Sequence, residues 1–435
     1  MPFSVGKIWK DFIDTTLVKV GMFNAFSVVF RVIFAYITNK IIVLYLGPVG
    51  TALTEQMRNF VQSLQGISTL GINEGVIRYS ALYQSRGKRL NYFLGTTYRL
   101  ILASSLVLML IILLFAPRIN DFLFSTRDYI LLVYLSAFVV PVYAVQVILL
   151  SVLQGFQEYK KVTYIITIVH FTGMVLTFIL VWQLKMLGAL LAVMITPVVS
   201  FSVILIFLGK DLKSLLIGPI ENGFTDLQKR QYIKRLVPFI WMAGITAIAI
   251  PLFTIALRNL IITHFTDEGQ IYAGYWDAVR KVSVFYFMFI TPVFSMYYFP
   301  RLSKLNGEGW WIHIKEMITK FYPFVLSGML LIYLFRRQVT LFIFSEAYDP
   351  MNPLYFWQLS GDLVRLFSLL LAYRFWAKAM VNRYIFSELS YWTLLYVLSY
   401  VWIQTGGLTG VMQAYLASNF YYLALMLLIF RNEVR

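Results

Sequence analysis

Twelve long apolar stretches constrain what this chain can fold into. A helix of about 20 residues crosses the roughly 30 Å of hydrocarbon in a bilayer, and each stretch is long enough to do so. They lie at about 18–46, 52–84, 93–116, 128–154, 162–184, 187–209, 236–262, 271–299, 318–336, 353–376, 380–403 and 408–430. The second (TEQMRNFVQSLQGISTLGINEGVIRY) is the least apolar, which is typical of a helix that lines water.

The composition agrees with a protein that lies in a lipid bilayer. Apolar residues make up 60% of the 435-residue chain, charged residues only 13%, and the mean hydropathy is +0.73. Soluble domains carry about 25% charged residues. A soluble fold of this length could not bury so much apolar side chain. We therefore predict an all-α polytopic membrane protein with twelve transmembrane helices.

Several classes of site are excluded by the residue types of the sequence. There is no cysteine, so neither disulfides nor thiolate metal ligands are expected. The three histidines, His170, His264 and His313, lack the spacing of a metal site. We interpret His170 as a helix-packing residue. No nucleotide-binding loop is present, so we expect neither ATP hydrolysis nor a cofactor.

Basic residues are concentrated on one side of the predicted spans. Cytoplasmic loops of membrane proteins carry an excess of Lys and Arg. The side that holds both termini has many such residues: Lys7, Lys10, Arg86, Lys88, Arg89, Lys160, Lys161, those of the connection 210–235, Arg301, Lys304, Lys315, Arg431 and Arg435. The opposite side holds only Arg118, Arg127, Lys185, Arg336 and Arg337. The N-terminal MPFSVGKIWKDF lacks a signal-peptide pattern. Both termini are therefore expected in the cytoplasm.

The longest and most polar connection, residues 210–235, falls between the sixth and seventh spans. Each half opens with a long helix and a turn; NKIIVLYLGPVG, from Asn39, corresponds to NLIITHFTDEGQ, from Asn259. Paired halves around a central site are a common transporter plan. We predict an N-terminal six-helix lobe (1–209), a cytoplasmic linker (210–235) and a C-terminal six-helix lobe (236–435).

Ionisable residues recur inside the predicted spans, although each costs about 2.5–3.5 kcal/mol on insertion scales. Residues three or four positions apart share a helix face and can form ion pairs. The predicted pairs are Asp277 with Arg280 and Lys281, Glu55 with Arg58, and Asp362 with Arg365. One interpretation is that these pairs only neutralise each other and ease insertion.

Pairing along single helices leaves a surplus of positive charge. Arg31, Lys40 and Arg258 have no acidic neighbour one turn away. Lone arginines are poorly tolerated against lipid, so we expect them to line an aqueous cavity. Because the planar guanidinium matches phosphate oxygens, the cavity suits a phosphate-bearing substrate. The candidate pyrophosphate ligands are Arg31, Arg58, Arg258, Arg280, Lys281 and Arg365.

Acidic and aromatic residues beside these cations suggest two further roles. A carboxyl group shielded from water can take up a proton near neutral pH, which makes Asp277, Asp362 and Glu388 candidates for coupling transport to a proton gradient. Permanent ionisation beside arginine is the alternative. Sugar rings stack on aromatic planes, so Tyr275, Trp276 and Trp357 are candidate glycan contacts, against an alternative role in the interfacial belt or core.

Several stretches resemble one known family, in the same order along essentially the whole chain. They are LGPVG (46–50) with Arg58, FITPVFSMYYFPRLSKL (289–305) after GYWDAVRKVS, WQLSGDLVR (357–365), AKA (377–379) with Glu388 downstream, and QAYLA (413–417). This pattern resembles the Wzx-type O-antigen and lipid III flippases, part of the multidrug/oligosaccharidyl-lipid/polysaccharide exporter superfamily.

The resemblance implies two six-helix lobes in a V around a central cationic cavity. It also implies movement of undecaprenyl-pyrophosphate-linked oligosaccharide from the inner to the outer leaflet of the bacterial inner membrane. We expect this transport to proceed by alternating access. Asp362 and Arg365 occupy the family's Gly-Asp-x-x-Lys/Arg position. The implied partners are the lipid-linked oligosaccharide, the bilayer and other membrane proteins of polysaccharide assembly; no nucleic-acid partner is expected.

Two other functions compete with this prediction. A multidrug or cation antiporter of the same superfamily would need an acidic cavity, whereas the interior charge here is basic. A polyprenyl-linked membrane glycosyltransferase or polymerase would place acidic or histidine residues in a sizeable soluble loop, and the longest loop here is residues 210–235. We therefore expect a secondary-type transporter and no catalytic residues.

Overall fold

The computed structural model describes residues 16–84, 87–124, 126–209, 236–237, 240, 249–293, 308–378 and 380–434. These residues are almost entirely helical, as every backbone N–H and C=O in a bilayer must find a partner within the chain. The labelled helices are α2 (Thr16–Ser68), α3 (Asn73–Tyr83), α4 (Gly87–Phe124), α5 (Ile130–Gly155), α6 (Tyr159–Leu208), α9 (Gly269–Val293), α11 (Glu308–Lys320), α12 (Tyr322–Leu334), α13 (Arg336–Ile343), α14 (Leu354–Lys378) and α15 (Val381–Val434). A further helix spans Ala249–His264, and the 3₁₀ turns are η3 (Thr266–Glu268) and η5 (Glu346–Met351).

Three of the helices contain a sharp break and each provides two spans. Helix α2 breaks at Gly47, whose φ of 62° is readily adopted by glycine, and Pro48 starts the next segment. Helix α6 breaks at Lys185 and α15 at Gly407. With α4, α5, Ala249–His264, α9, α11 with α12, and α14, the described helices account for the twelve predicted spans.

Length and apolar composition alone mark six of the described helices as able to cross a membrane, including the three broken ones. Helices α9 and α14 are not among them although each has 25 residues. The former carries Asp277, Arg280 and Lys281, and the latter carries Asp362, Arg365, Arg374 and Lys378. The charged residues predicted for the site thus make these two helices too polar to be recognised as spans by composition alone, whereas α2 and α15, which carry other predicted site residues, are recognised.

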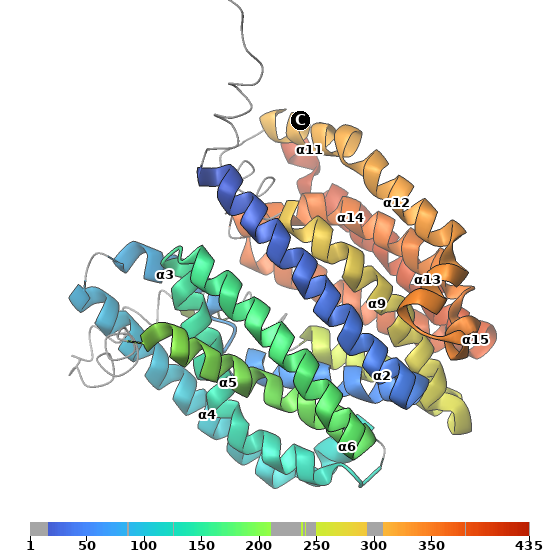
Figure 1. Ribbon diagram of the computed structural model, residues 1–435. Helices are drawn as coiled ribbons and strands as arrows, with labels where there is room; N and C mark the ends of the chain where they lie inside the picture. The colour runs from blue at the N-terminus through green and yellow to red at the C-terminus, as the bar shows by residue number, and fades with distance from the viewer. Residues whose placement is uncertain are drawn as a thin grey trace, which may run out of the picture.

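Each half of the chain has its own apolar core. Figure 1 shows α3–α6 on one side and α9–α15 on the other, with α2 running between them. One buried cluster belongs to the second half apart from Val43 and Ala52 of α2. Two others belong to the first half apart from Leu236 and Ile255. The buried apolar side chains therefore gather mainly within each half of the chain, and the V of two lobes stays a prediction. The predicted linker, 210–235, lies outside the described residues.

Small hydroxyl side chains inside the apolar helices bond to their own helix. Ser105 of α4 donates to the carbonyl of Ile101 at 2.6 Å, and Thr97 donates to that of Phe93 at 2.9 Å. Such bonds to the carbonyl four residues earlier satisfy a hydroxyl group without a partner on another helix. They leave the charged residues of α2, α9 and α14 as the main polar groups that need partners between helices.

Candidate functional site

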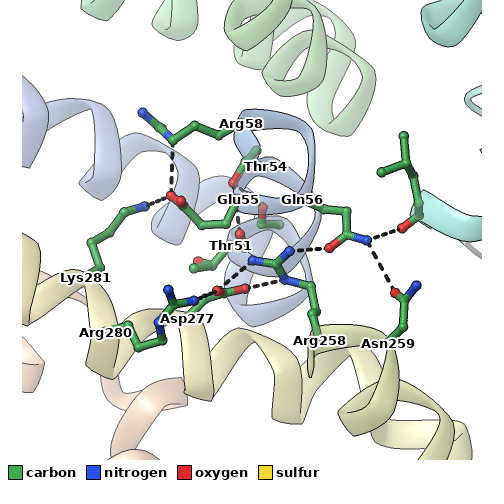
Figure 2. Close-up of polar contacts among 12 residues, drawn as sticks. Thr51, Thr54, Glu55, Gln56, Arg58, Arg258, Asn259, Asp277, Arg280 and Lys281 are labelled. Carbon is green, nitrogen blue, oxygen red and sulfur yellow. Dashed lines mark hydrogen bonds and ion pairs between the residues drawn. The ribbon is translucent and has the colours of Figure 1, made fainter. Parts of the chain in front are cut away.

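A buried ion pair joins Ala249–His264 to α9, next to residues of α2 (Figure 2). Arg258 Nε and Nη2 donate to Asp277 Oδ2 and Oδ1, both at 2.7 Å. Side-chain exposure is 1% for Arg258 and 3% for Asp277. This bidentate geometry is the strongest arrangement of a guanidinium and a carboxylate. The prediction that Arg258 is an unpaired cation is therefore wrong, because its partner lies on the next span.

Gln56 ties this pair to the first half of the chain. Its amide oxygen accepts a hydrogen bond from Arg258 Nη1, and its amide nitrogen donates to the carbonyl of Leu123 at 2.7 Å. Asn259, next to Arg258, donates to the carbonyl of Phe122 at 2.6 Å. The guanidinium of Arg258 thus has partners on two helices, α9 and α2, and links the two halves of the chain.

Glu55 forms a second bridge between the halves. It accepts Lys281 Nζ of α9 at 2.6 Å and lies 3.4 Å from Arg58 Nε. The Glu55–Arg58 pair is confirmed. Lys281, predicted to pair with Asp277 on its own helix, pairs instead with Glu55 of α2. Arg280 does approach Asp277, at 3.7 Å.

The charges of this network do not cancel. Four basic residues share two carboxylates, those of Glu55 and Asp277. The side chains of Arg58 and Arg280 are 43% and 35% exposed, whereas Arg258 is enclosed. The surplus positive charge is therefore presented by two accessible guanidinium groups, one on α2 and one on α9 (Figure 2).

Arg365 of α14 lies in a second cluster, formed with side chains of α15. Its guanidinium lies 3.8 Å from Glu388 and 4.5 and 4.6 Å from the rings of Tyr391 and Tyr422. Tyr422 also donates to Glu388 at 2.6 Å. Cation–π contacts of this kind stabilise an arginine removed from water. The predicted pair of Asp362 with Arg365 is wrong, because Arg365 turns toward α15.

Asp362 is instead surrounded by neutral donors. Ser283 Oγ, Gln358 Nε2 and Tyr286 donate to Oδ2, the first two at 2.6 and 2.9 Å, and Tyr415 donates to Oδ1 at 2.6 Å. The residue is 1% exposed and makes no ion pair with a described side chain. Among the three predicted coupling residues it is the one without a cation, since Asp277 and Glu388 have theirs.

Arg31 lies in α2 before the break at Gly47 and is partly exposed. Its Nε has no hydrogen-bond partner among the described residues. Unlike Arg258, Arg31 therefore has an N–H donor that is not bonded to any described residue.

Lys40 does not line an interior surface as predicted. It lies near the break of α2, at the end of the molecule formed by Gly47, η3 and the segment from α13 to η5, which we call the distal end. Its ammonium group donates to the carbonyls of Leu341 and Phe342 at 3.1 and 3.0 Å and to that of Phe344. A cation at the carbonyl end of α13 is stabilised by the partial negative charge there.

Further contacts join the halves around Lys40, and together we call them the distal latch. Tyr36 donates to the carbonyl of Phe342 at 2.9 Å and stacks on its ring, with centroids 5.0 Å apart. Asn39 donates to the carbonyl of Ile343 at 3.3 Å. The hydroxyl groups of Thr51 and Tyr348 lie 2.5 Å apart. The latch closes the distal end between α2 and the α13–η5 segment.

The three predicted aromatic contacts have different surroundings. Trp276 is buried, and the guanidinium carbons of Arg280 and Arg258 lie 4.3 and 5.7 Å from the centre of its ring. Its ring therefore makes cation–π contacts with arginine instead of facing a glycan. Tyr275 is half-buried and meets Tyr348 edge-on. Trp357 is half-buried and packs against the core of the second half.

Several site residues are absent from the sequence-based set. Gln358 lies four residues before Asp362, so helical spacing could have identified it. Spacing along one helix carries no signal for the partners from other helices, which are Gln56, Ser283, Tyr286, Tyr391, Tyr415 and Tyr422.

Comparison with known families identifies the chain. Residues 17–306 match the family described as polysaccharide biosynthesis protein. The chain belongs to this family. This match, the lipid III flippase relatives and the solved structures described next together confirm the resemblance to Wzx-type flippases drawn from the sequence.

One such relative is the lipid III flippase of Escherichia coli (strain K12). It is 29% identical over 419 residues, which is 94% of this chain and 97% of the relative. The lipid III flippase of Shigella flexneri gives the same values.

Solved transporter structures share the fold of this chain. A multidrug resistance MATE family transporter of the MOP superfamily, in an inward-facing conformation, has a TM-score of 0.70 at 16% identity, covering 93% of this chain and 94% of its own. The lipid II flippase MurJ, in an inward closed conformation, has a TM-score of 0.70 at 13% identity, covering 95% of this chain and 87% of its own. These matches confirm the predicted twelve-helix exporter architecture.

Proposed function

We propose that this protein is a flippase that moves undecaprenyl-pyrophosphate-linked oligosaccharide across the inner membrane. Family membership and the lipid III flippase relatives support a transporter of a lipid-linked oligosaccharide. The observation that carries the proposal is the surplus positive charge at the interface between the halves, presented by Arg58 and Arg280. Guanidinium groups bind phosphate oxygens through charge-assisted, often bidentate hydrogen bonds, so two accessible ones suit a pyrophosphate.

In this proposal the arginines and their carboxylates alternate between two sets of partners. Arg31, Arg58 and Arg280 bind the pyrophosphate in a chamber between the lobes, while the polyprenyl tail stays in lipid. Arg258 and Lys281 position the neighbouring groups through Asp277 and Glu55. When substrate leaves, Glu55 and Asp277 again neutralise Arg58 and Arg280. The substrate class therefore includes O-antigen and related surface polysaccharide units, and the glycan contacts proposed for Tyr275 and Trp357 fall on partly exposed aromatic rings.

Asp362 is the proposed coupling group. A carboxylate with four neutral donors and no described cation can gain or lose a proton without breaking an ion pair. Asp277 and Glu388, by contrast, each neutralise an arginine. We therefore assign proton coupling to Asp362 alone. The proposed role of Glu388 is to neutralise and position Arg365.

The basic side of the predicted spans is the proposed cytoplasmic side, so the distal latch faces the periplasm. Alternating access then requires the latch to open when the substrate leaves the chamber. The competing function, a multidrug or cation antiporter, is disfavoured because accessible guanidinium groups repel a cationic drug.

Complementation of a strain that lacks its own lipid-linked oligosaccharide flippase tests the proposal. Wild-type protein should restore surface polysaccharide, and Arg31→Ala and Arg58→Ala should each reduce it at least about tenfold, the loss expected for a charge-assisted hydrogen bond. Arg337→Ala is the matched control, because that side chain is 73% exposed at the distal end. Mass spectrometry of the lipid-linked sugar that accumulates identifies the glycan. Full activity of both chamber variants would contradict the proposal.

A further inference from the structure

His170 of α6 is a polar side chain that the site described above does not use. It lies in the first segment of α6, before the break at Lys185, and is partly exposed. Helix α2 packs along this segment: the ring of Phe171 meets that of Phe34 edge-on, with centroids 5.6 Å apart. Phe34 is one helical turn after Arg31, so this contact places His170 and Arg31 at the same depth.

Arg31 and Arg58 are the charged residues that interact electrostatically with the His170 ring. These three residues come from three spans: α2 before Gly47, α2 after it, and α6. The carboxylate nearest to Arg58 is that of Glu55, which is already bonded to Lys281 at 2.6 Å. The positive charge of these three residues is that of the two arginines, and Glu55 is the one described carboxylate that pairs with either of them.

The nitrogen atoms of His170 are available to a ligand. No described residue makes a hydrogen bond to them, and they are not among the buried polar atoms that lack a partner. An imidazole that served only to pack helices would leave its N–H either satisfied by protein or enclosed. Here the ring nitrogens are neither bonded to a described residue nor fully enclosed, and Nε of Arg31 also lacks a partner.

We propose that His170 is a third ligand of the substrate phosphate, donating a ring N–H beside Arg31 and Arg58. This inference rests on the proposed function. Imidazole can donate to phosphate without adding a third permanent charge to the empty chamber. Donors from three spans would hold a tetrahedral phosphate from three directions, so His170 sets the position of the pyrophosphate along the chamber. It thereby replaces the interpretation of His170 as a packing residue.

Binding measurements on the full-length protein in detergent test this role. The probe is undecaprenyl pyrophosphate, and undecaprenol, which lacks the phosphates, is its control. His170→Phe, which keeps a ring but removes the donor, should weaken binding of the probe about tenfold. His170→Gln keeps an N–H donor and should stay within about threefold of wild type. His264→Phe makes the same chemical change far from the chamber and should bind normally.

An NMR signature supplies a second readout that does not depend on a variant folding well. The chain has three histidines, so ¹⁵N-histidine labelling gives few ring resonances, and His170→Gln assigns one of them. In the wild-type protein that resonance should shift with undecaprenyl pyrophosphate and not with undecaprenol. An unmoved resonance, or normal binding by His170→Phe while Arg31→Ala loses binding, would overturn the role of His170 alone. Normal binding by Arg31→Ala as well would overturn the phosphate chamber itself.

Discussion

At the scale of single residues, the charged side chains divide into those that hold the structure and those left accessible. Arg258 and Arg365 are each enclosed by a carboxylate and further contacts, whereas Arg58 and Arg280 remain exposed. Removing a charge from water is tolerable only with a well-placed partner. Each enclosed arginine therefore depends on one specific acidic residue, and the exposed ones are free to exchange partners.

Replacing Asp277 separates these two roles. Asp277→Asn leaves Arg258 buried without its counter-charge and should destabilise the protein by about 3–5 kcal/mol, as found when one partner of a buried ion pair is removed. The double variant Arg258→Met/Asp277→Leu removes both charges and should recover most of that loss. Unfolding in mixed detergent with increasing SDS measures both. A double variant no more stable than Asp277→Asn would show that the network depends on Gln56 and not on the ion pair.

Asp362→Asn tests the coupling group with almost no change of volume. If Asp362 carries the proton, substrate transport into proteoliposomes should no longer respond to an imposed pH gradient, because an amide cannot take up or release a proton. The wild-type rate should change at least about tenfold between the two gradient directions, equivalent to about 1.4 kcal/mol. Asp349→Asn, which alters an exposed carboxylate beside Arg337, should behave as wild type. Gradient-dependent transport by Asp362→Asn would exclude this residue as the proton carrier.

At the scale of helices, close approach explains why the carboxylate of Asp362 has so many donors. Gly361 precedes it, and a Cβ atom at Gly361 would lie only 2.5 Å from the ring of Tyr415. Glycine therefore lets α15 come close enough for Tyr415 to reach Asp362. The Gly-Asp pair in this position is thus a packing requirement of α14 against α15 as well as a source of charge.

The distal latch is the element expected to move during transport. Lys40→Met keeps the length of the side chain but removes its hydrogen bonds to the end of α13, so the distal end should open in a larger fraction of molecules. Spin labels on Leu131→Cys and Glu346→Cys would report this as a longer distance in pulsed EPR. The absence of native cysteine makes such labelling direct. Lys185→Met, at another exposed distal position, is the control, and identical distance distributions in both variants would contradict the latch.

At the scale of the whole molecule, the sequence predicted what depends on one helix at a time. Apolar length predicted the spans, and a spacing of three residues predicted Glu55–Arg58. Prediction from the sequence failed where the partner of a charged residue lies on another helix or is a backbone carbonyl. Arg365 pairs with Glu388 on α15 and not with Asp362, and Lys40 binds main-chain carbonyls, which every residue possesses. A spacing rule cannot rank such partners, because helix rotation and packing decide which face of α14 meets α15.

The orientation proposed for the whole molecule rests on its basic residues, and single cysteines can test it. Because Lys and Arg are enriched on the cytoplasmic side, we predict that the C-terminal Arg431 lies inside and the exposed Asp267 of η3 outside. In spheroplasts, a membrane-impermeant maleimide should label Asp267→Cys at once and Arg431→Cys only after permeabilisation. The reverse pattern would turn the distal latch toward the cytoplasm. The direction of transport proposed for the chamber would then be wrong, although its affinity for phosphate would not be affected.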